Sequence, residues 1–169
     1  PNGSADGIAL LASNGERAFS RGNTGTRYQL VFYNPNGLVG RIETGGSSTN
    51  YLTSSDYRLK ENATAIADGI TRLKTLKPYR FNFKADATTT VDGFFAHEVT
   101  AVPEATSGAK DAVVTQAMID AGDYEEGTLN DPIHQGIDQS KLVPLLTAAL
   151  QEAITKIETL ETKVAALEG

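Results

Sequence analysis

A heptad repeat of apolar residues near the C-terminal end is the feature that most constrains this sequence. Its members are spaced alternately four and three residues apart, and they are Leu146, Leu150, Ala153, Ile157, Leu160, Val164 and Leu167. A helix with this spacing carries one apolar stripe, which it buries against the matching stripes of other helices. The sequence therefore predicts a coiled-coil helix over about residues 145–168, with Pro144 in the first turn, where proline is tolerated.

Charged residues beside this stripe indicate how the helices pair. Lys156 and Lys163 lie at position g of the heptad, whereas Glu161 and Glu168 lie at position e. In a parallel pairing each lysine faces the glutamate of its neighbour five residues further along. Ile154, also at position e, widens the apolar stripe and favours more than two helices. We therefore expect parallel association of more than two chains.

Short β segments separated by turn residues fill the first 53 residues. We expect strands at residues 7–12, 27–33 and 38–44 and a short segment at 51–52, with turns at 13–15 (SNG) and 34–37 (NPNG). Strands with so little apolar material do not close a barrel alone, so we favour a β region intertwined between chains, which covers its edges. The alternative is a small β meander of a larger domain before Pro1, since the start at Pro1 resembles a fragment boundary.

The central part of the sequence mixes helix and strand signals. We expect a helix over residues 61–76, strands at 79–83 and 91–96 with a loop at 86–90 between them, and a short helix over 112–121. The first helix is indicated by apolar residues at i, i+4 and i+7 from Ile66, and a proline ends it. Pairing of the two strands would bring Phe81 or Phe83 close to Phe94 or Phe95.

Composition excludes several classes of function. The formal net charge is −6, so the basic surface that a nucleic acid needs is not expected. The sequence has no cysteine, which excludes disulfides, thiolate metal sites and cysteine nucleophiles. No apolar run approaches the roughly 18 residues of a membrane span. We therefore expect no nucleic-acid partner, no membrane partner and no cofactor.

Two local patterns raise the question of a metal, and we interpret both otherwise. His97-Glu98 lacks a second histidine at helical spacing, so we expect a histidine or glutamate that hydrogen-bonds the backbone near the chemically active stretch. The acidic stretch at residues 119–131 lacks the alternating oxygen ligands and the closing glutamate of an EF-hand loop. We interpret it as a solvated loop and expect no metal site.

Residues 54–62 contain a hydroxyl and an amine five residues apart, those of Ser55 and Lys60. A serine hydroxyl becomes a good nucleophile when a base takes its proton, and a neutral lysine is such a base. One turn or bend between the two residues brings Oγ and Nζ together. Serine and lysine at this spacing are common, and a turn followed by a helix start fits the same residues.

Residues 55–62 (SDYRLKEN) resemble the Ser-Asp-x-Arg-Leu-Lys signature of the intramolecular chaperone of endosialidase type, the S74 peptidase family. The resemblance continues in residues 76–83 (LKPYRFNF), 93–99 (GFFAHEV) and 142–146 (LVPLL), and covers about residues 54–169. The chain departs from the family at His97, where glutamine is commoner, and at the acidic stretch, which resembles an insertion. Neither departure touches Ser55 or Lys60.

The resemblance implies a homotrimeric chaperone that helps the preceding β-rich segment of a phage tail fibre or tailspike to fold. The chaperone then releases itself by cutting the peptide bond between Ser54 and Ser55. Ser55 is the nucleophile in this scheme and Lys60 the general base of a single-turnover serine peptidase. Asp56 and Arg58 support the site by shaping its turn, as an ion pair or through backbone bonds.

The same resemblance implies the organisation of the chain. Residues 1–54 would be the end of the β-rich fibre, and residues 55–169 a mixed α/β chaperone and auto-protease domain that ends in a parallel trimeric coiled coil. The expected fold class is α+β, with the N-terminal β region intertwined in the trimer. The expected location is a virion tail fibre precursor assembled in the host cytoplasm, and any binding to a host receptor would belong to the fibre.

Two other functions stay open on the sequence. One is a structural fibre tip that never cleaves and that the coiled coil holds together. The other is a receptor- or glycan-binding module that uses loops such as residues 123–132.

Overall fold

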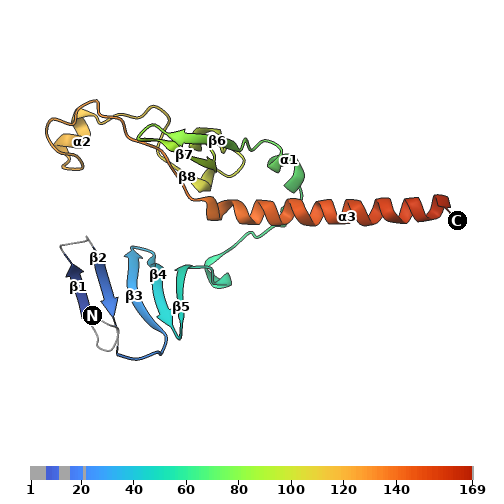
Figure 1. The fold of residues 1–169 in the computed structure, drawn as a ribbon, viewed down its shortest axis with the longest axis horizontal. Coiled ribbons are helices and arrows are strands. Elements are labelled where there is room, and N and C mark those ends of the chain that lie inside the picture. Colours follow the sequence, from blue (N-terminus) through green and yellow to red (C-terminus); the bar gives the residue numbers. More distant parts are fainter. Residues whose placement is uncertain (1–6, 12–15, 21, 169) are drawn as a thin grey trace. The chain divides into compact units, whose positions relative to one another are not determined.

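A computed structural model describes residues 7–11, 16–20 and 22–168 of the chain. The fold is α+β, as predicted, with short antiparallel strands and one long helix (Figure 1). The chain divides into two compact units, Pro1–Ala63 and Thr64–Gly169. The intertwined β region, the trimer, the coiled coil and a functional division at Ser54–Ser55 stay predictions.

The first unit consists of antiparallel strands followed by one 3-10 turn. Its elements are β1 (Gly7–Leu11), β2 (Glu16–Ser20), β3 (Arg27–Asn34), β4 (Gly37–Gly45), β5 (Ser48–Thr53) and η1 (Tyr57–Leu59). β1 pairs with β2, and β3, β4 and β5 form a separate sheet in that order. The predicted turn at residues 13–15, like the predicted strand end at Ala12, lies outside the described residues.

The hairpin of β3 and β4 confirms the prediction made from residues 27–44. Asn34 pairs with Gly37 across a two-residue turn of Pro35 and Asn36. The Asn36 N–H donates to Asn34 Oδ1 at 2.9 Å, and Gly37 has a φ of 94°, which glycine adopts without strain. β5 is longer than the short segment predicted at residues 51–52.

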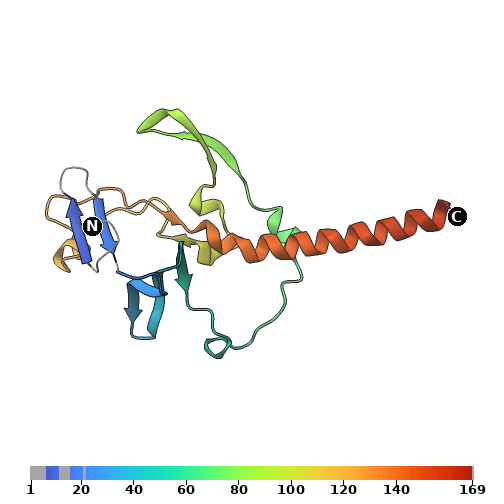
Figure 2. The same cartoon turned by 60° about the horizontal axis from the view of Figure 1, so that its bottom comes forward.

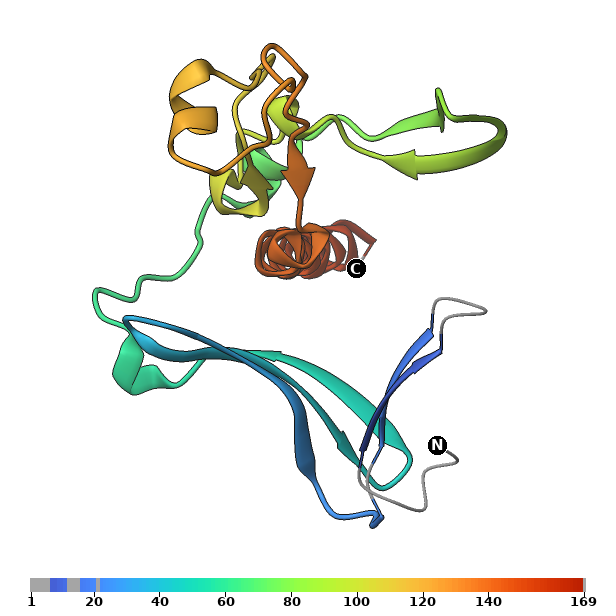
Figure 3. The same cartoon turned by 90° about the vertical axis from the view of Figure 1, so that its left-hand side faces the viewer.

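The second unit mixes short helices and strands and ends in the long helix. Its elements are α1 (Gly69–Leu73), β6 (Tyr79–Phe83), β7 (Asp86–Gly93), η2 (Ala96–Glu98), η3 (Pro103–Ala105), β8 (Thr106–Ser107), α2 (Gln116–Asp120), β9 (Gly136–Ile137), η4 (Gln139–Leu142) and α3 (Val143–Glu168). The β6–β7 hairpin projects from the rest of this unit (Figures 2 and 3). Pro144 lies in the first turn of α3, as predicted.

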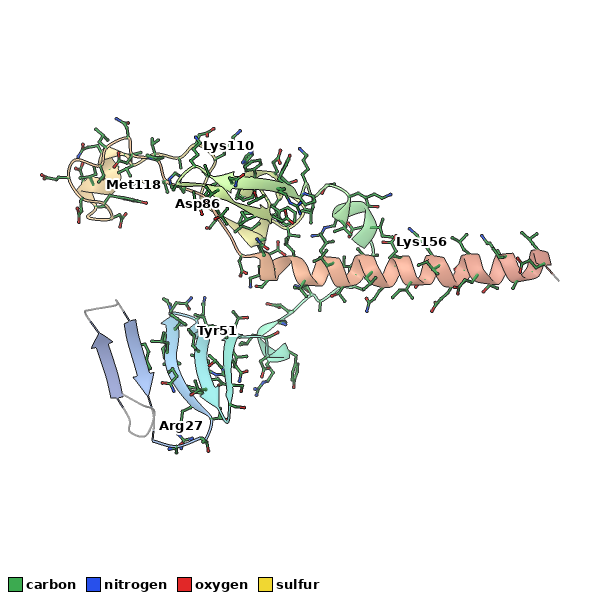
Figure 4. The ribbon with its side chains drawn as sticks, in the orientation of Figure 1. Arg27, Tyr51, Asp86, Lys110, Met118 and Lys156 are labelled. Carbon is green, nitrogen blue, oxygen red and sulfur yellow. The ribbon has the colours of Figure 1, made fainter. Side chains whose placement is uncertain are left out.

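The core of the second unit lies where the start of α3 meets the segments before it. Its buried side chains are Val99, Val102, Ala105, Leu142 and Leu145. The C-terminal half of α3, which includes Lys156, extends past the other elements of this unit (Figure 4). Only the first turns of α3 therefore contribute to the core of a single protomer.

Helix α1 packs directly against α3. The Ile70 N–H donates to Glu152 Oε2 at 3.0 Å, so a carboxylate of the long helix satisfies a free amide of the short one. Gly69 is buried, and a Cβ at this position would lie 2.5 Å from the backbone nitrogen of Ala149. The two helices approach this closely because residue 69 has no side chain.

Three predicted elements of the second half have the wrong bounds. The helix predicted over residues 61–76 is confined to Gly69–Leu73, since Asn62 is left-handed at φ 54° and only the later residues meet α3. The loop predicted at 86–90 is part of β7, because three successive β-branched threonines favour a strand. The helix predicted over 112–121 begins only at Gln116, because Val113 bridges Pro132 as in a sheet.

The predicted contact between the strands of the β6–β7 hairpin and the phenylalanines after it is confirmed for one pair. The rings of Phe81 and Phe95 stack with centroids 6.2 Å apart, and Tyr79 also contacts Phe95 at 4.9 Å. Such aromatic contacts stabilise the base of the hairpin.

We predict that Gly69→Ala destabilises the second unit by about 1–3 kcal/mol, because the added methyl group forces α1 away from the α3 backbone. Denaturant unfolding of the full chain, followed by helical circular dichroism, measures the effect. The control is Thr71→Ala, an exposed change on the same helix that is expected to shift stability by less than about 0.5 kcal/mol. Equal stability of both variants would contradict the tight approach of the helices.

A second prediction concerns Asp86, which follows the two-residue turn of the β6–β7 hairpin. Hydrogen bonds from Thr89 and Thr88 lower the pKa of this carboxyl from 3.8 to about 2. Because the folded pKa is the lower one, ionised Asp86 stabilises the hairpin above about pH 4, and this contribution disappears as the pH falls towards 2. NMR titration of the side-chain carboxyl should show this pKa.

The matched variants for this titration are Thr88→Val and Thr90→Val. Thr88 Oγ1 donates to Asp86 Oδ1 at 2.8 Å, so its loss should raise the Asp86 pKa towards the ordinary value. Thr90 Oγ1 instead accepts from Asn82 across the hairpin at 3.2 Å, and its loss should leave the Asp86 pKa in place. An Asp86 pKa near 3.8 in the unmutated chain would refute the assignment.

Candidate functional site

Ser54 is fixed to strand β4 immediately after β5 ends. Its N–H donates to the Val39 carbonyl at 3.2 Å, and its hydroxyl donates to the Leu38 carbonyl at 2.7 Å. In the β4–β5 ladder Gly40 pairs with Thr53, so the next residue, Ser54, lies beside the β4 residues that precede Gly40. The residue on the acyl side of the predicted cleavage bond is therefore held by the sheet.

The 3-10 turn η1 then brings the chain back towards Ser55. Asp56 caps the turn by accepting a hydrogen bond from the Arg58 N–H at 2.9 Å. The Leu59 N–H donates to the Asp56 carbonyl, and the Lys60 N–H donates to the Tyr57 carbonyl, both at 3.1 Å. This local bonding is what a short aspartate-capped turn is expected to make.

The turn places the lysine amine against the serine hydroxyl. Lys60 Nζ donates to Ser55 Oγ at 2.8 Å. The same contact also has the length that the hydroxyl needs to donate to a neutral amine. A contact of this length meets the geometric requirement for a general base beside a nucleophile.

Asp56 and Arg58 form a bidentate ion pair on the turn. Arg58 Nε donates to Asp56 Oδ1 at 2.9 Å, and Arg58 Nη2 donates to Asp56 Oδ2 at 2.7 Å. The guanidinium lowers the pKa of the Asp56 carboxyl, and the carboxylate raises the pKa of Arg58. The expected ion pair and a backbone bond are therefore both present, and their importance for the site stays a prediction.

The whole stretch is exposed in a single protomer. Every residue from 53 to 68 is exposed, including Ser55 and Lys60. Two apolar side chains of η1 are especially open to water, Tyr57 at 81 % and Leu59 at 69 % exposure. Exposed large apolar groups on both sides of Arg58 indicate a surface that a further chain can bury.

The interpretation of His97-Glu98 is wrong about the partners of these residues. The Glu98 carboxylate accepts from Lys77 Nζ at 3.1 Å, and the His97 ring stacks on Phe95. Tyr79 and Lys77 together lower the pKa of Glu98. The pair thus contacts side chains of the β6–β7 region rather than the backbone.

Metal and membrane sites can be judged for the part of the chain that the structure describes. Among residues 7–11, 16–20 and 22–168, no three His, Cys, Asp or Glu side chains are grouped so that they could hold a metal ion. Within the same residues, no helix is long and apolar enough to cross a membrane. The acidic stretch forms local turns, one of which is closed by Thr128 donating to the Glu125 carbonyl.

Sequence reasoning found Ser55 and Lys60 but missed how Ser54 is held. The partner of the Ser54 hydroxyl is a backbone carbonyl 16 residues earlier, and any residue type supplies that acceptor. The only available signal was the position of a hydroxyl residue directly after a strand. Its partner follows from the register of β4 and β5, which the sequence did not define.

Comparison with known families agrees with the local signature. The family model described as chaperone of endosialidase, peptidase S74, matches residues 55–108 and begins at Ser55. No curated protein matches the chain. The family description supports a chaperone role, and the peptidase classification suggests self-cleavage. Residues 55–108 are thus similar to the chaperone of endosialidase family, peptidase S74.

Proposed function

We propose that this chain is an intramolecular chaperone that assembles a β-rich fibre segment as a homotrimer and then cuts itself off between Ser54 and Ser55. The observation that carries the proposal is the 2.8 Å contact of Lys60 Nζ with Ser55 Oγ, next to an acyl residue held by the sheet. The family match that begins at Ser55 supports the same position for the cut.

The reaction follows from the atoms in the turn. Neutral Lys60 takes the hydroxyl proton while Ser55 Oγ attacks the carbonyl carbon of Ser54. The bond from that carbon to the Ser55 nitrogen breaks, and Lys60 returns the proton to the departing amine. The acyl group is then an ester on Ser55 Oγ. Water hydrolyses this ester, which gives a Ser54 carboxylate and restores the Ser55 hydroxyl.

The exposed stripe of α3 supports association through this helix. Apart from the half-buried Ala153, the heptad residues beyond the first turn are exposed; Leu150 is 62 % exposed and Ile157 is 54 % exposed. Isolated protomers would leave this stripe in water, whereas parallel α3 helices would bury it against one another. The glutamates and lysines that flank the stripe favour the parallel arrangement.

The exposed sheet of the first unit supports association with further copies of the same chain. β3 exposes apolar and aromatic side chains along its length, namely Tyr28, Leu30, Val31, Phe32 and Tyr33. A single layer of three strands cannot cover these groups by itself. Packing of this sheet on copies of itself would bury them and supply the fibre segment that the chaperone serves.

Assembly provides a physical reason why cleavage follows folding. In one protomer the Lys60 side chain is exposed to water. A further chain that covers Tyr57 and Leu59 would also exclude water from the adjacent amine and favour its neutral, basic form. Cleavage would then proceed only after the chains have associated.

The phage context completes the proposal. The chaperone family suggests a tail fibre or tailspike precursor in a virus-infected cell, with residues 55–169 released and residues 1–54 left on the fibre. Its partners are then two further copies of the chain and the preceding fibre segment. A fibre tip that never cleaves is the competing function, and the experiments below separate the two.

We predict that the expressed chain yields two fragments on denaturing electrophoresis, one that ends at Ser54 and one that begins at Ser55. Ser55→Ala should abolish cleavage, and Lys60→Arg should slow it by at least about 100-fold, because a guanidinium keeps its charge but does not act as a base. N-terminal sequencing of the larger fragment identifies the bond.

Lys84→Ala is the control for this prediction, since it removes an exposed lysine in the turn of the β6–β7 hairpin. It should cleave like the unmutated chain. An intact band from an unmutated, fully assembled trimer would reject self-cleavage and leave the non-cleaving fibre tip as the function.

We also predict that Ile157→Asp prevents both trimer formation and cleavage, because three carboxylates would meet in the apolar seam. Thr162→Asp is the matched control, since position 162 lies at f, outside the seam, and should leave both unchanged. Light scattering measures the oligomer, and electrophoresis of the same sample measures the cut. Normal cleavage by a monomeric Ile157→Asp chain would contradict the proposal that cleavage requires association of the chains.

A further inference from the structure

We propose that the Ser54 hydroxyl is a positioning group that ties the cut to correct pairing of β4 and β5. This inference rests on the proposed self-cleavage between Ser54 and Ser55. It assigns a role to the residue on the acyl side of the bond, whereas the reaction itself needs only the nucleophile and the base.

The contacts of Ser54 immobilise one end of the reacting peptide. Its N–H and its hydroxyl donate to two successive carbonyls of β4, those of Val39 and Leu38, at 3.2 Å and 2.7 Å. The other end is held by the contact between Ser55 and Lys60. Attack by Oγ needs a fixed direction towards the carbonyl carbon, and loss of rotation at both ends supplies it.

The hydroxyl bond also explains where the chain leaves the sheet. The last pair of the β4–β5 ladder is Gly40 with Thr53, and the Ser54 N–H extends the bonding by one residue. The next acceptor along β4, the Leu38 carbonyl, is taken by the side chain of Ser54 rather than by a further backbone amide. The backbone of Ser55 is thereby free to enter the η1 turn.

If this inference holds, the rate of cleavage depends on the register in which β4 and β5 of the same chain pair. If β5 pairs in another register, the Leu38 carbonyl is no longer beside Ser54, and the acyl end of the bond becomes free to rotate. A chain with the wrong register would then cleave slowly even when its lysine is deprotonated. This requirement differs from the proposed need for assembly, because it depends on two strands of the same protomer.

The inference predicts the side chains that position 54 accepts. Threonine keeps the hydroxyl, whereas valine has nearly the same shape and lacks it. Ser54→Thr should therefore cleave at close to the unmutated rate, and Ser54→Val should cleave about tenfold more slowly, as expected for loss of one hydrogen bond that aligns the reacting groups. Ser54→Ala, which introduces no bulk, should be as slow as Ser54→Val.

The experiment is a pulse-chase of the full chain made by cell-free translation, with the two fragments quantified over time and at several pH values. A positioning role lowers the rate by the same factor at every pH and leaves the midpoint of the pH profile unchanged. Thermal unfolding of the Thr, Val and Ala variants, each combined with Lys60→Arg, shows whether the three chains fold and assemble equally.

The outcomes separate this inference from the proposed function. Cleavage by Ser54→Val and Ser54→Ala as fast as by Ser54→Thr would overturn the positioning role and leave self-cleavage intact. Slow cleavage that tracks a lower unfolding midpoint in both hydroxyl-free variants would also overturn it, in favour of a purely structural effect. An unmutated chain that never cuts would overturn the proposed function itself.

Discussion

Apolar side chains that one protomer leaves in water are the constraint on which the rest of this structure depends. They lie along the outer part of α3 and on β3, while only a small core around Leu145 closes the second unit. Burial stabilises by about 25 cal/mol for each Å² of apolar surface, so surfaces of this kind favour association strongly. The proposed trimer follows from this imbalance, and the proposed timing of the cut follows from the trimer.

The site shows which parts of a structure a sequence can predict. Asp56, Arg58 and the turn between Ser55 and Lys60 interact within a few residues, so the spacing allowed these contacts and the family resemblance singled them out. The Ser54 contacts depend on the register of two strands, which involves residues distant in the sequence. Contacts within residues 55–60 could therefore be expected from the sequence, whereas the hydrogen bonds that hold Ser54 to β4 could not.

The same distinction explains the errors in the fold. The long helix and the β3–β4 hairpin have strong local signals and were predicted with nearly correct bounds. The helix predicted from residue 61 is short because tertiary packing against α3 begins only at Gly69. Val113 and Val114 have a periodicity that also fits a helix, but Val114 instead exchanges backbone bonds with Asn130 and Asp131. In each case a distant segment decided between two local possibilities.

The proposed cut lies between a paired strand and a short turn, and this location favours cleavage over re-formation of the peptide bond. Before cleavage the two ends of the bond are held by different elements, Ser54 by β4 and Ser55 by the η1 turn. After hydrolysis the new carboxylate stays with the sheet, and the new amine leaves with the turn and everything that follows it. Separation of the two would prevent resealing, and loss of the helix that is proposed to align the chains would remove the template for their refolding. The completed fibre would then be stable for kinetic reasons, since its unfolded chains lack the segment that assembled them.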